Sequence, residues 1–156
     1  MGNDVGMTEM AGRNPDYEAE VSSSFARQGL MTTLGARLTN VEPGSVEIEV
    51  PFREDLTQQH GLFHGGVTTS IADTACGYSA LTLMPPGSEV LSVEFKINLF
   101  APARGDKLVA RGRVVRSGRT LTVCQGDVYA VTLESEVHVA TMVATMMRVD
   151  PSQASL

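Results

Sequence analysis

The 156-residue chain contains few cysteines, no tryptophan and no long apolar run. Its only two cysteines, Cys76 and Cys124, form no CxxC pair and do not build a disulfide framework. No stretch approaches the ~18 apolar residues of a membrane-spanning helix, and the polar segment 1–16 lacks the apolar centre of a secretion signal. With a formal net charge of -6, the chain also lacks the basic excess that binds nucleic-acid phosphates. These absences predict a soluble cytoplasmic enzyme or small-molecule binder, with neither a membrane nor a nucleic acid as partner.

The length and the hydrophobic content predict a single globular domain. With 42% hydrophobic residues, the chain can bury a core without help from disulfides or metals. Residues 1–14 have no apolar period, which predicts a flexible acidic N-terminal arm. The polar segment 150–156 is expected to be a frayed tail, so the domain itself is predicted over residues 15–149.

A short helix is predicted at the start of this domain. Asn14 is a suitable N-cap residue, and Pro15 is favoured in the first helical turn. A helix over residues 15–29 would place Val21 and Phe25 on one face.

Alternating apolar and polar residues predict strands over most of the remaining chain. The clearest strand is 91–99, which strictly alternates between the two kinds of residue. Its apolar residues are expected to share one face and are Leu91, Val93, Phe95, Ile97 and Leu99. A turn signal at Ser117-Gly118 predicts a hairpin. The other strands are expected over residues 36–41, 45–50, 106–115, 120–130 and 136–147.

One segment follows the spacing of a helix instead. Between Gly65 and Leu83 the apolar residues recur at helical intervals and many residues are small, as in a helix closely wrapped by a sheet. Pro85-Pro86-Gly87 ends this segment. The whole pattern predicts an α+β fold in which an antiparallel sheet of five or six strands curls around one long helix.

The most informative motif is the loop that leads into this helix, which ends in His64-Gly65-Gly66. Backbone N–H groups in the first turn of a helix lack partners within the helix, and the helix dipole adds positive potential there. Glycines let a substrate oxygen approach these N–H groups, as in an oxyanion hole or an anion site. The alternative is a glycine-rich loop that only turns the chain.

Asp73 is the second candidate, because it lies in an otherwise apolar helix, two turns after Gly66. A carboxylate among apolar neighbours loses hydration unless it opens onto a cleft, so Asp73 is a candidate for catalysis. The alternatives are a solvated outer face of the helix or a partner such as an arginine. Both stay open on the sequence pattern alone.

The distance between Gly65 and Asp73 indicates whether one chain can form the active site alone. Gly65 and Asp73 are eight residues apart, or about 12 Å along one helix. A catalytic group must lie within about 3 Å of the atom that it attacks, and that atom is bonded to the oxyanion. One helix therefore cannot easily supply both groups, whereas two helices meeting across a twofold axis can. An active site here is predicted to be shared between the subunits of a dimer.

Other chemistries fit the pattern less well. His60, His64 and Asp73 could be imagined as metal ligands, but the adjacent glycines favour a backbone site, so no metal is predicted. Cys76, on a face of small residues, and Cys124, in a strand, are expected to be buried thiols rather than nucleophiles.

The motifs taken together resemble a known family. The His-Gly-Gly motif at 64–66, followed by Asp73, is similar to the signature of hotdog-fold acyl-CoA thioesterases of the PaaI-like and 4-hydroxybenzoyl-CoA thioesterase group. Segments 92–106 and 115–120 also resemble this group, and the likeness extends over about residues 30–149. The resemblance implies a hotdog fold, an acyl-CoA substrate, no cofactor, and a homodimer or homotetramer.

The resemblance also implies roles for individual residues. Asp73 would attack the thioester or activate water, and the Gly65 N–H would polarise the thioester carbonyl, with His64 shaping the loop. Gln58 stands where many relatives carry an asparagine that orients the carbonyl or the water, and it is one methylene longer. Ser92 occupies a strand position that can hydrogen-bond the carboxylate or the water.

Other residues are expected to bind the two ends of the substrate, the acyl group and the nucleotide of coenzyme A. Residues such as Leu62, Phe63, Tyr78 and Leu81 would line the pocket for the acyl group, which is expected to be medium-chain or aryl. Gly66 would contact the substrate through its backbone N–H. Relatives bind the nucleotide end of coenzyme A near the hairpin turn that Arg116 and Arg119 flank here. Arginine suits bidentate contacts with the coenzyme A phosphates.

The two arginines belong to the one basic segment of the chain. Residues 104–119 hold six of its twelve Lys and Arg residues against a single acid. Arg111 and Arg113 share one strand face, for which a solvated surface is the alternative to phosphate binding.

The sequence therefore predicts an acyl-CoA thioesterase that produces a free acid and coenzyme A. A non-catalytic acyl-CoA binding module is the alternative, although such a module has no need for a carboxylate at Asp73. Hotdog dehydratases and hydratases are a further alternative, and these pair a catalytic histidine with a carboxylate in a different sequence frame.

Overall fold

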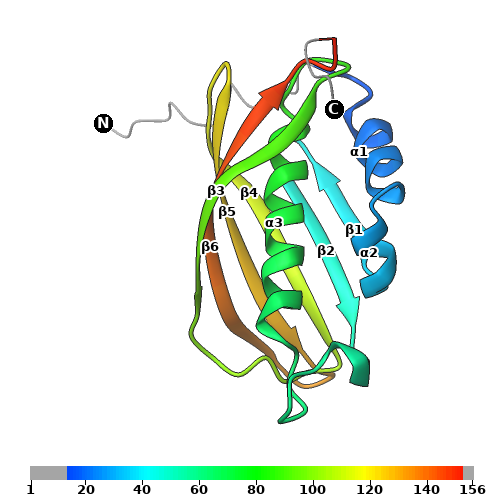
Figure 1. Cartoon of the computed structure of the whole chain (residues 1–156), viewed down its shortest axis with the longest axis vertical. Coiled ribbons are helices and arrows are strands. Elements are labelled where there is room, and N and C mark those ends of the chain that lie inside the picture. The colour runs from blue at the N-terminus through cyan, green and yellow to red at the C-terminus, as the bar shows by residue number, and fades with distance from the viewer. Residues whose placement is uncertain (1–13, 153–156) are drawn as a thin grey trace.

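The computed structural model describes residues 14–152, which form one antiparallel sheet and three α-helices (Figure 1). The sheet has six strands in the order β1-β2-β4-β5-β6-β3. The strands are β1 (Arg37–Glu42), β2 (Ser45–Pro51), β3 (Glu89–Leu99), β4 (Lys107–Ser117), β5 (Leu121–Val131) and β6 (Glu136–Val149). The arm predicted over residues 1–14 lies almost wholly outside the described residues, as does most of the tail predicted over 150–156.

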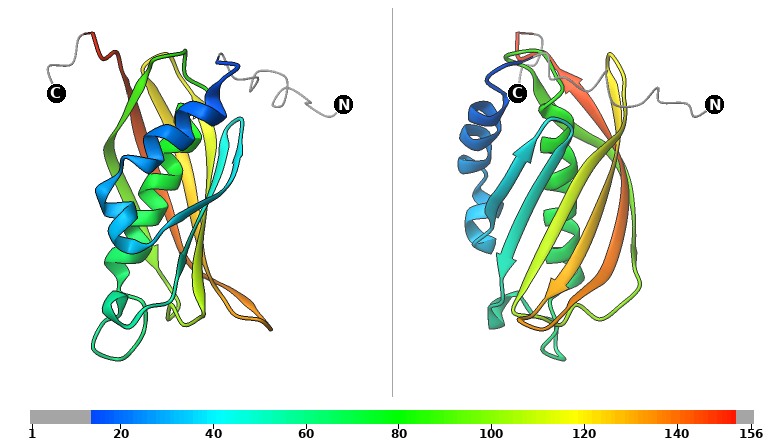
Figure 2. Two further views of the ribbon diagram at one scale, coloured as in Figure 1. Left: turned by 90° about the vertical axis from the view of Figure 1, so that its right-hand side faces the viewer. Right: turned by 180° about the vertical axis from the view of Figure 1, so that it is seen from behind.

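The long helix α3 (Gly65–Leu81) lies along the inner face of the curled sheet, as Figures 1 and 2 show. Two glycines allow this close approach. A Cβ atom at Gly112 of β4 would lie 2.4 Å from the carbonyl oxygen of Ala75, and one at Gly126 of β5 would lie 2.9 Å from Sγ of Cys76. The predicted α+β architecture, with a sheet wrapped around one helix, is confirmed.

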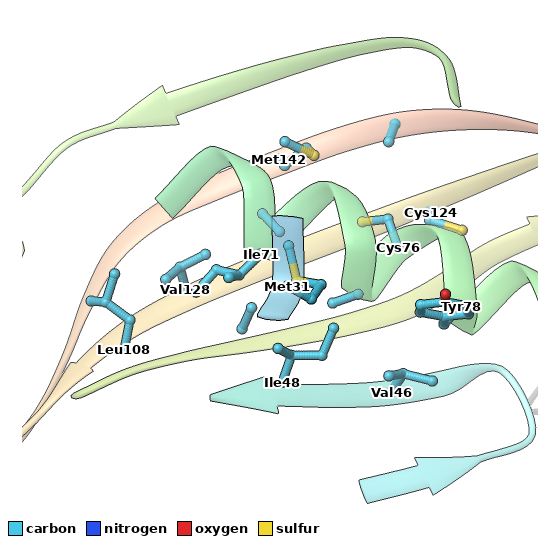
Figure 3. Packing of buried hydrophobic residues seen from close by; sticks show 14 of the residues in the cluster. Met31, Val46, Ile48, Ile71, Cys76, Tyr78, Leu108, Cys124, Val128 and Met142 are labelled. Carbon is cyan, nitrogen blue, oxygen red and sulfur yellow. The ribbon is translucent and has the colours of Figure 1, made fainter. Parts of the chain in front are cut away.

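The hydrophobic core fills the space between α3 and the sheet. Figure 3 shows Ile71 of α3 facing Ile48 of β2 and Leu108 of β4, and all three side chains are fully buried. Met31, from the N-terminal part of the chain, is buried in the same cluster. The sheet, α3 and the N-terminal segment that carries Met31 therefore share one core. This shared core fixes the position of α3.

The N-terminal helix predicted over residues 15–29 is shorter than expected, and a second helix that was not predicted follows it. Helix α1 (Tyr17–Ala26) and helix α2 (Gly29–Leu34) are separated by Gln28, whose backbone is extended. Both helices run beside α3 (Figure 2). None of the helices between residues 14 and 152 combines the length and the apolar character needed to cross a membrane.

The start of α1 also differs from the prediction. Asn14 is not the N-cap residue, since Asp16 holds that position. Oδ1 of Asn14 instead accepts a hydrogen bond of 2.9 Å from the N–H of Asp16, which forms a turn just before the helix. Val21 is fully buried and Phe25 packs against the core from one side, so the predicted inner face of this helix is confirmed.

Strand β3 lies at the edge of the sheet and contains a β-bulge. Its pairing with β6 shifts between Ser92 and Glu94, so Val93 is an extra residue on this strand. Because a bulge inserts one residue, the alternation before Val93 is out of phase with the alternation after it. The prediction that all apolar residues of 91–99 share one face is therefore wrong.

The bulge decides which side chains of β3 face the helix. Ser92 lies opposite Met146 and Phe95 lies opposite Ala144, and opposite residues of paired strands point to the same side of the sheet. Met146 and Ala144 are fully buried, so Ser92 and Phe95 point inward. Leu91 points to the other side.

Candidate active site

Asp73 lies midway along α3, where Ser92 of β3 meets it. The Ser92 hydroxyl donates a hydrogen bond of 2.6 Å to Oδ1 of Asp73 and lies 3.4 Å from Sδ of Met146. A bond this short is typical of a hydroxyl that donates to an ionised carboxylate. Among residues 14–152 no arginine or lysine forms an ion pair with Asp73, so the alternative of an arginine partner has no support there.

Asp73 and Ser92 open onto a cavity of about 340 Å³. Helix α3 and strands β3 and β6 form most of its wall, and the N-terminal helices contribute Ser24 and Gln28. The Tyr78 hydroxyl joins these two residues, because it donates to Oγ of Ser24 at 3.1 Å and accepts from Nε2 of Gln28 at 3.0 Å. Burial raises the pKa of Tyr78 above its usual value, so this hydroxyl stays protonated at neutral pH.

The helix tip is organised by His64, the N-cap residue of α3. Nδ1 of His64 accepts a hydrogen bond of 2.8 Å from the Gly66 N–H, so the neutral ring carries its proton on Nε2. The carbonyl oxygen of His64 accepts from the N–H groups of Val67 and Thr68. Among the residues that the structure describes, the Gly65 N–H is left without an acceptor.

This arrangement corrects one expectation from the sequence. Gly66 was expected to offer its N–H to the substrate, but that N–H is already bonded to His64. A Cβ atom at Gly66 would lie 2.9 Å from Nδ1 of His64, so the glycine makes room for the capping ring. Gly65 is therefore the residue of this pair that can donate to a substrate oxygen.

Gly65 lines a second cavity, of about 170 Å³, together with Gln58, Leu62 and Phe63. The loop that carries them is held by its own hydrogen bonds. The Gln58 N–H donates to the Leu62 carbonyl at 2.9 Å, and Oε1 of Gln58 accepts from the His60 N–H. Phe63 is almost fully buried and forms a fixed part of the wall, while Leu62 is half-buried.

The candidate residues thus form two separate groups within one chain. Ser92 accompanies Asp73 in the larger cavity, and Gln58 accompanies Gly65 in the smaller one. Neither of these two cavities is lined by both Gly65 and Asp73. This separation agrees with the expectation that one helix does not supply both groups to one reacting atom.

Arg116 and Arg119 lie at the hairpin between β4 and β5, at the opposite end of α3 from the His-Gly-Gly loop (Figure 1). Both are exposed, and neither forms an ion pair within the described part of the chain. Arg111 differs, because its guanidinium pairs with Glu47 at 2.9 Å and with Glu136 at 2.6 Å. Arg111 is therefore explained by ion pairs on the solvated surface of the sheet. The guanidinium groups of the two hairpin arginines have no such partners among the described residues and are available to bind a ligand.

Other reactive groups contribute little to this site. Cys76 and Cys124 are buried in the core, and burial raises the pKa of Cys76 and raises the pKa of Cys124 to about 12. Both thiols stay protonated at neutral pH, so they are not nucleophiles. Within residues 14–152, no three His, Cys, Asp or Glu side chains come close enough to hold a metal ion.

Some residues that line the two cavities were not predicted from the sequence. Ser24 and Gln28 belong to a predicted helix, but nothing in their spacing indicates that they meet Tyr78. Thr68 lies one turn after Gly65 on the same helix and lines the same cavity. Helical spacing from Gly65 could have singled out Thr68.

Comparison with known proteins identifies the family. Residues 60–136 match the profile of the thioesterase superfamily. A solved thioesterase family protein from Silicibacter pomeroyi is 46% identical, with a TM-score of 0.84 over 86% of this chain and 98% of that protein. The chain belongs to the thioesterase superfamily. The hotdog fold implied by the sequence resemblance is therefore confirmed, and the protein is a hydrolase of the thioesterase class.

More distant relatives agree with this placement. A Halobacterium salinarum protein named as an esterase is 30% identical over 122 residues, which are 74% of this chain and 80% of that protein. Human acyl-coenzyme A thioesterase 13 is 31% identical over 91 residues, which are 58% of this chain and 64% of that protein. The thioesterase superfamily is thus matched by sequence as well as by fold.

Proposed function

We propose that this thioesterase hydrolyses medium-chain or aryl acyl-CoA to the free acid and coenzyme A, at an active site shared between two copies of the chain. The observation that carries the proposal is the division of the candidate groups between two cavities. Asp73 is oriented by Ser92 in one cavity, and Gly65 offers a free N–H in the other. The name of the human relative, an acyl-coenzyme A thioesterase, supports coenzyme A as the leaving group.

Strand β3 supports the assembly of two copies. It is an edge strand, and its apolar side chains are exposed to an extent unusual for a monomer, with Phe95 at 44% and Leu99 at 55%. A second copy related by a twofold axis would cover this strand. If the two α3 helices ran antiparallel across the axis, each helix tip would approach Asp73 of the partner subunit. Pairing of such dimers would give the alternative homotetramer.

The chemistry then divides between the subunits. The Gly65 N–H of one subunit donates to the thioester carbonyl oxygen and stabilises the negative charge that develops there. Asp73 of the other subunit, held by Ser92, takes a proton from water while the water oxygen bonds to the carbonyl carbon. The C–S bond then breaks, and the proton passes to the sulfur of coenzyme A. In the alternative route Asp73 attacks the carbon itself, and the C–S bond breaks to give a mixed anhydride and the thiolate of coenzyme A. Water then hydrolyses the anhydride, which releases the free acid and restores Asp73, and a proton from this water passes to the thiolate.

The remaining residues of the helix tip orient the substrate in this proposal. His64 and Gly66 fix the first turn of α3, which aims the Gly65 N–H. The Gln58 amide orients the carbonyl or the water, and Leu62 and Phe63 contact the acyl group.

The hairpin arginines would bind the nucleotide end of coenzyme A. Because the hairpin lies at the opposite end of α3 from the helix tip, an antiparallel arrangement would bring Arg116 and Arg119 of one subunit toward the tip of the other. Their exposed guanidinium groups suit the phosphates of coenzyme A.

A panel of aliphatic and aryl acyl-CoAs, assayed by release of free thiol, tests the reaction. The wild-type protein should hydrolyse at least one class, and Asp73→Asn should abolish turnover while acyl-CoA still binds. Asparagine keeps the size of the side chain and removes its basicity. Binding without thiol release by the wild-type protein would instead establish the alternative, a non-catalytic acyl-CoA binding module.

Subunit mixing tests whether the site is shared. Asp73→Asn subunits lack the base, and Gly65→Ala subunits keep the N–H but carry a methyl group that blocks the approach of the substrate oxygen to it. A mixture of these inactive subunits should form hybrid dimers with one intact site. Random exchange should restore about a quarter of wild-type activity, since half of the dimers are hybrids and each has one of two sites. Gly65→Ala should fold, because its Cβ would meet only the flexible end of Leu99, at 3.0 Å. No recovery despite demonstrated exchange would refute the shared site.

A further inference from the structure

The hydroxyl of Thr68 lacks a hydrogen-bond partner within residues 14–152, although the side chain is only 1% exposed. A buried hydroxyl without a partner is costly, because the hydrogen bonds that it made with water are not replaced. An unpartnered polar group in a native protein therefore calls for a physical explanation.

Other hydroxyls of α3 show how a helix usually solves this problem. The side chains of Thr69, Ser70 and Ser79 each donate to the backbone carbonyl four residues earlier, at 2.8, 2.7 and 2.7 Å. Thr68 makes no such bond, and its hydroxyl is fully buried. The equivalent acceptor is the carbonyl oxygen of His64, which already accepts from the N–H of Val67 at 2.9 Å and from that of Thr68 at 3.3 Å. Since a carbonyl oxygen has two lone pairs, this acceptor is fully used.

The position of Thr68 directs its hydroxyl toward the helix tip. Thr68 follows Gly65 by three residues, so the two lie on one face of α3. Side chains in a helix lean toward its N-terminus and cover the preceding turn, which here begins at Gly65. Both residues line the same cavity of about 170 Å³, whose other walls are largely apolar, among them Leu99 and Val139. Two donors without partners, an N–H and an O–H, therefore lie beside one apolar space.

We propose that Thr68 is a second hydrogen-bond donor to the thioester carbonyl oxygen that the Gly65 N–H polarises. The inference rests on the proposed function, in which that oxygen enters the cavity at the helix tip. A carbonyl oxygen has two lone pairs and can accept from both donors at once. In the apolar surroundings of the cavity, each donor stabilises the developing negative charge more strongly than it would in water.

Two substitutions at Thr68 separate the hydroxyl from the shape of the side chain. Thr68→Val removes the hydroxyl and keeps the volume, and it should lower kcat by at least about tenfold, a larger factor than any rise in KM. Thr68→Ser keeps the hydroxyl and should retain most of kcat. The unfolding temperature of Thr68→Val should equal or exceed that of the wild type, because an unpartnered hydroxyl is replaced by a methyl group. A wild-type kcat in Thr68→Val, or a change confined to KM, would overturn the proposal.

Ser79→Ala is the matched control. It also removes a buried hydroxyl from α3, but that hydroxyl is bonded to the Ala75 carbonyl and lines neither cavity. Its kcat should equal that of the wild type. A loss of kcat in Ser79→Ala as large as in Thr68→Val would show that removing any helix hydroxyl disturbs the site, and would overturn the special role of Thr68.

A binding measurement distinguishes this inference from the proposed function. A CoA ketone analogue, with a methylene group between sulfur and carbonyl, keeps the carbonyl but cannot be hydrolysed, and a CoA thioether lacks the carbonyl. Thr68→Val should weaken binding of the ketone and leave binding of the thioether unchanged, as measured by calorimetry. Equal effects on the two ligands would overturn the role of Thr68. Absence of hydrolysis by the wild type, with Thr68-dependent ketone binding, would refute the proposed function alone.

Discussion

The capping interaction between His64 and Gly66 makes a quantitative prediction about stability. Gly66 has no positive φ, so alanine fits its backbone. Its Cβ, however, would lie 2.9 Å from Nδ1 and 3.3 Å from Cε1 of His64. The ring would have to move away from the position in which Nδ1 accepts from the Gly66 N–H at 2.8 Å. Gly66→Ala therefore breaks the cap of α3, as His64→Ala does directly.

The two single variants should nevertheless differ in stability. Loss of the cap lowers the free energy of unfolding by about 1 kcal/mol. In Gly66→Ala this loss is offset by the higher helix propensity of alanine, which is worth up to about 1 kcal/mol. His64→Ala has no such offset. In the double variant the cap is lost only once, so it should be about 1 kcal/mol more stable than His64→Ala.

Urea denaturation at one fixed protein concentration measures these differences, since subunit association would otherwise alter the midpoints. Gly29→Ala, which begins α2 with no atom within 4 Å of its new Cβ, measures the propensity gain alone. The coupling between His64 and Gly66 should be about 1 kcal/mol, well above the ~0.3–0.5 kcal/mol scatter of independent sites. Additive effects of the two single variants, with no coupling above that scatter, would refute the capping argument.

Three further predictions concern the sheet, the hairpin and a core thiol. Gly112→Ala should destabilise the protein by about 1–3 kcal/mol or more in thermal unfolding, because its Cβ would lie 2.4 Å from the rigid backbone oxygen of Ala75; an unchanged midpoint would contradict the close packing of β4 on α3. Replacing Arg116 and Arg119 by alanine should raise KM for acyl-CoA in a salt-dependent manner but not for the matching acyl-pantetheine, which lacks the nucleotide phosphates; equal changes for both substrates would argue against phosphate binding. Burial raises the pKa of Cys124 to about 12, so a thiol reagent at neutral pH should label Cys124 only as fast as the protein opens, and rapid labelling of the native protein would contradict its burial.

Much of the fold was predictable because its signals are local. Hydrophobic alternation and turn residues act within a few positions, and they located all six strands and the hairpin at Ser117-Gly118. The change from alternation to helical spacing placed the start of α3 at Gly65. Helix α2 was not predicted, because its six residues are too few to show a helical period.

The candidate site was predictable to a lesser degree. The motif pointed to Gly65 and Asp73, and their spacing along one helix already argued that a single chain does not join them. It did not indicate that His64 would take the Gly66 N–H, since that depends on the rotamer and position of the ring. The orphaned hydroxyl of Thr68 was likewise invisible, because it results from the two N–H groups that already occupy the His64 carbonyl.

By itself the sequence determined the order of the elements, the apolar helix inside the sheet and the candidate residues for the proposed chemistry. Tertiary structure alone decided how those residues face one another. Alternation predicted Ser92 on the side of the strand opposite Phe95, yet the bulge at Val93 turns it inward onto Asp73. The physical reason is that strand register is set by pairing with β6, more than 40 residues away in the chain, which no local pattern in β3 encodes.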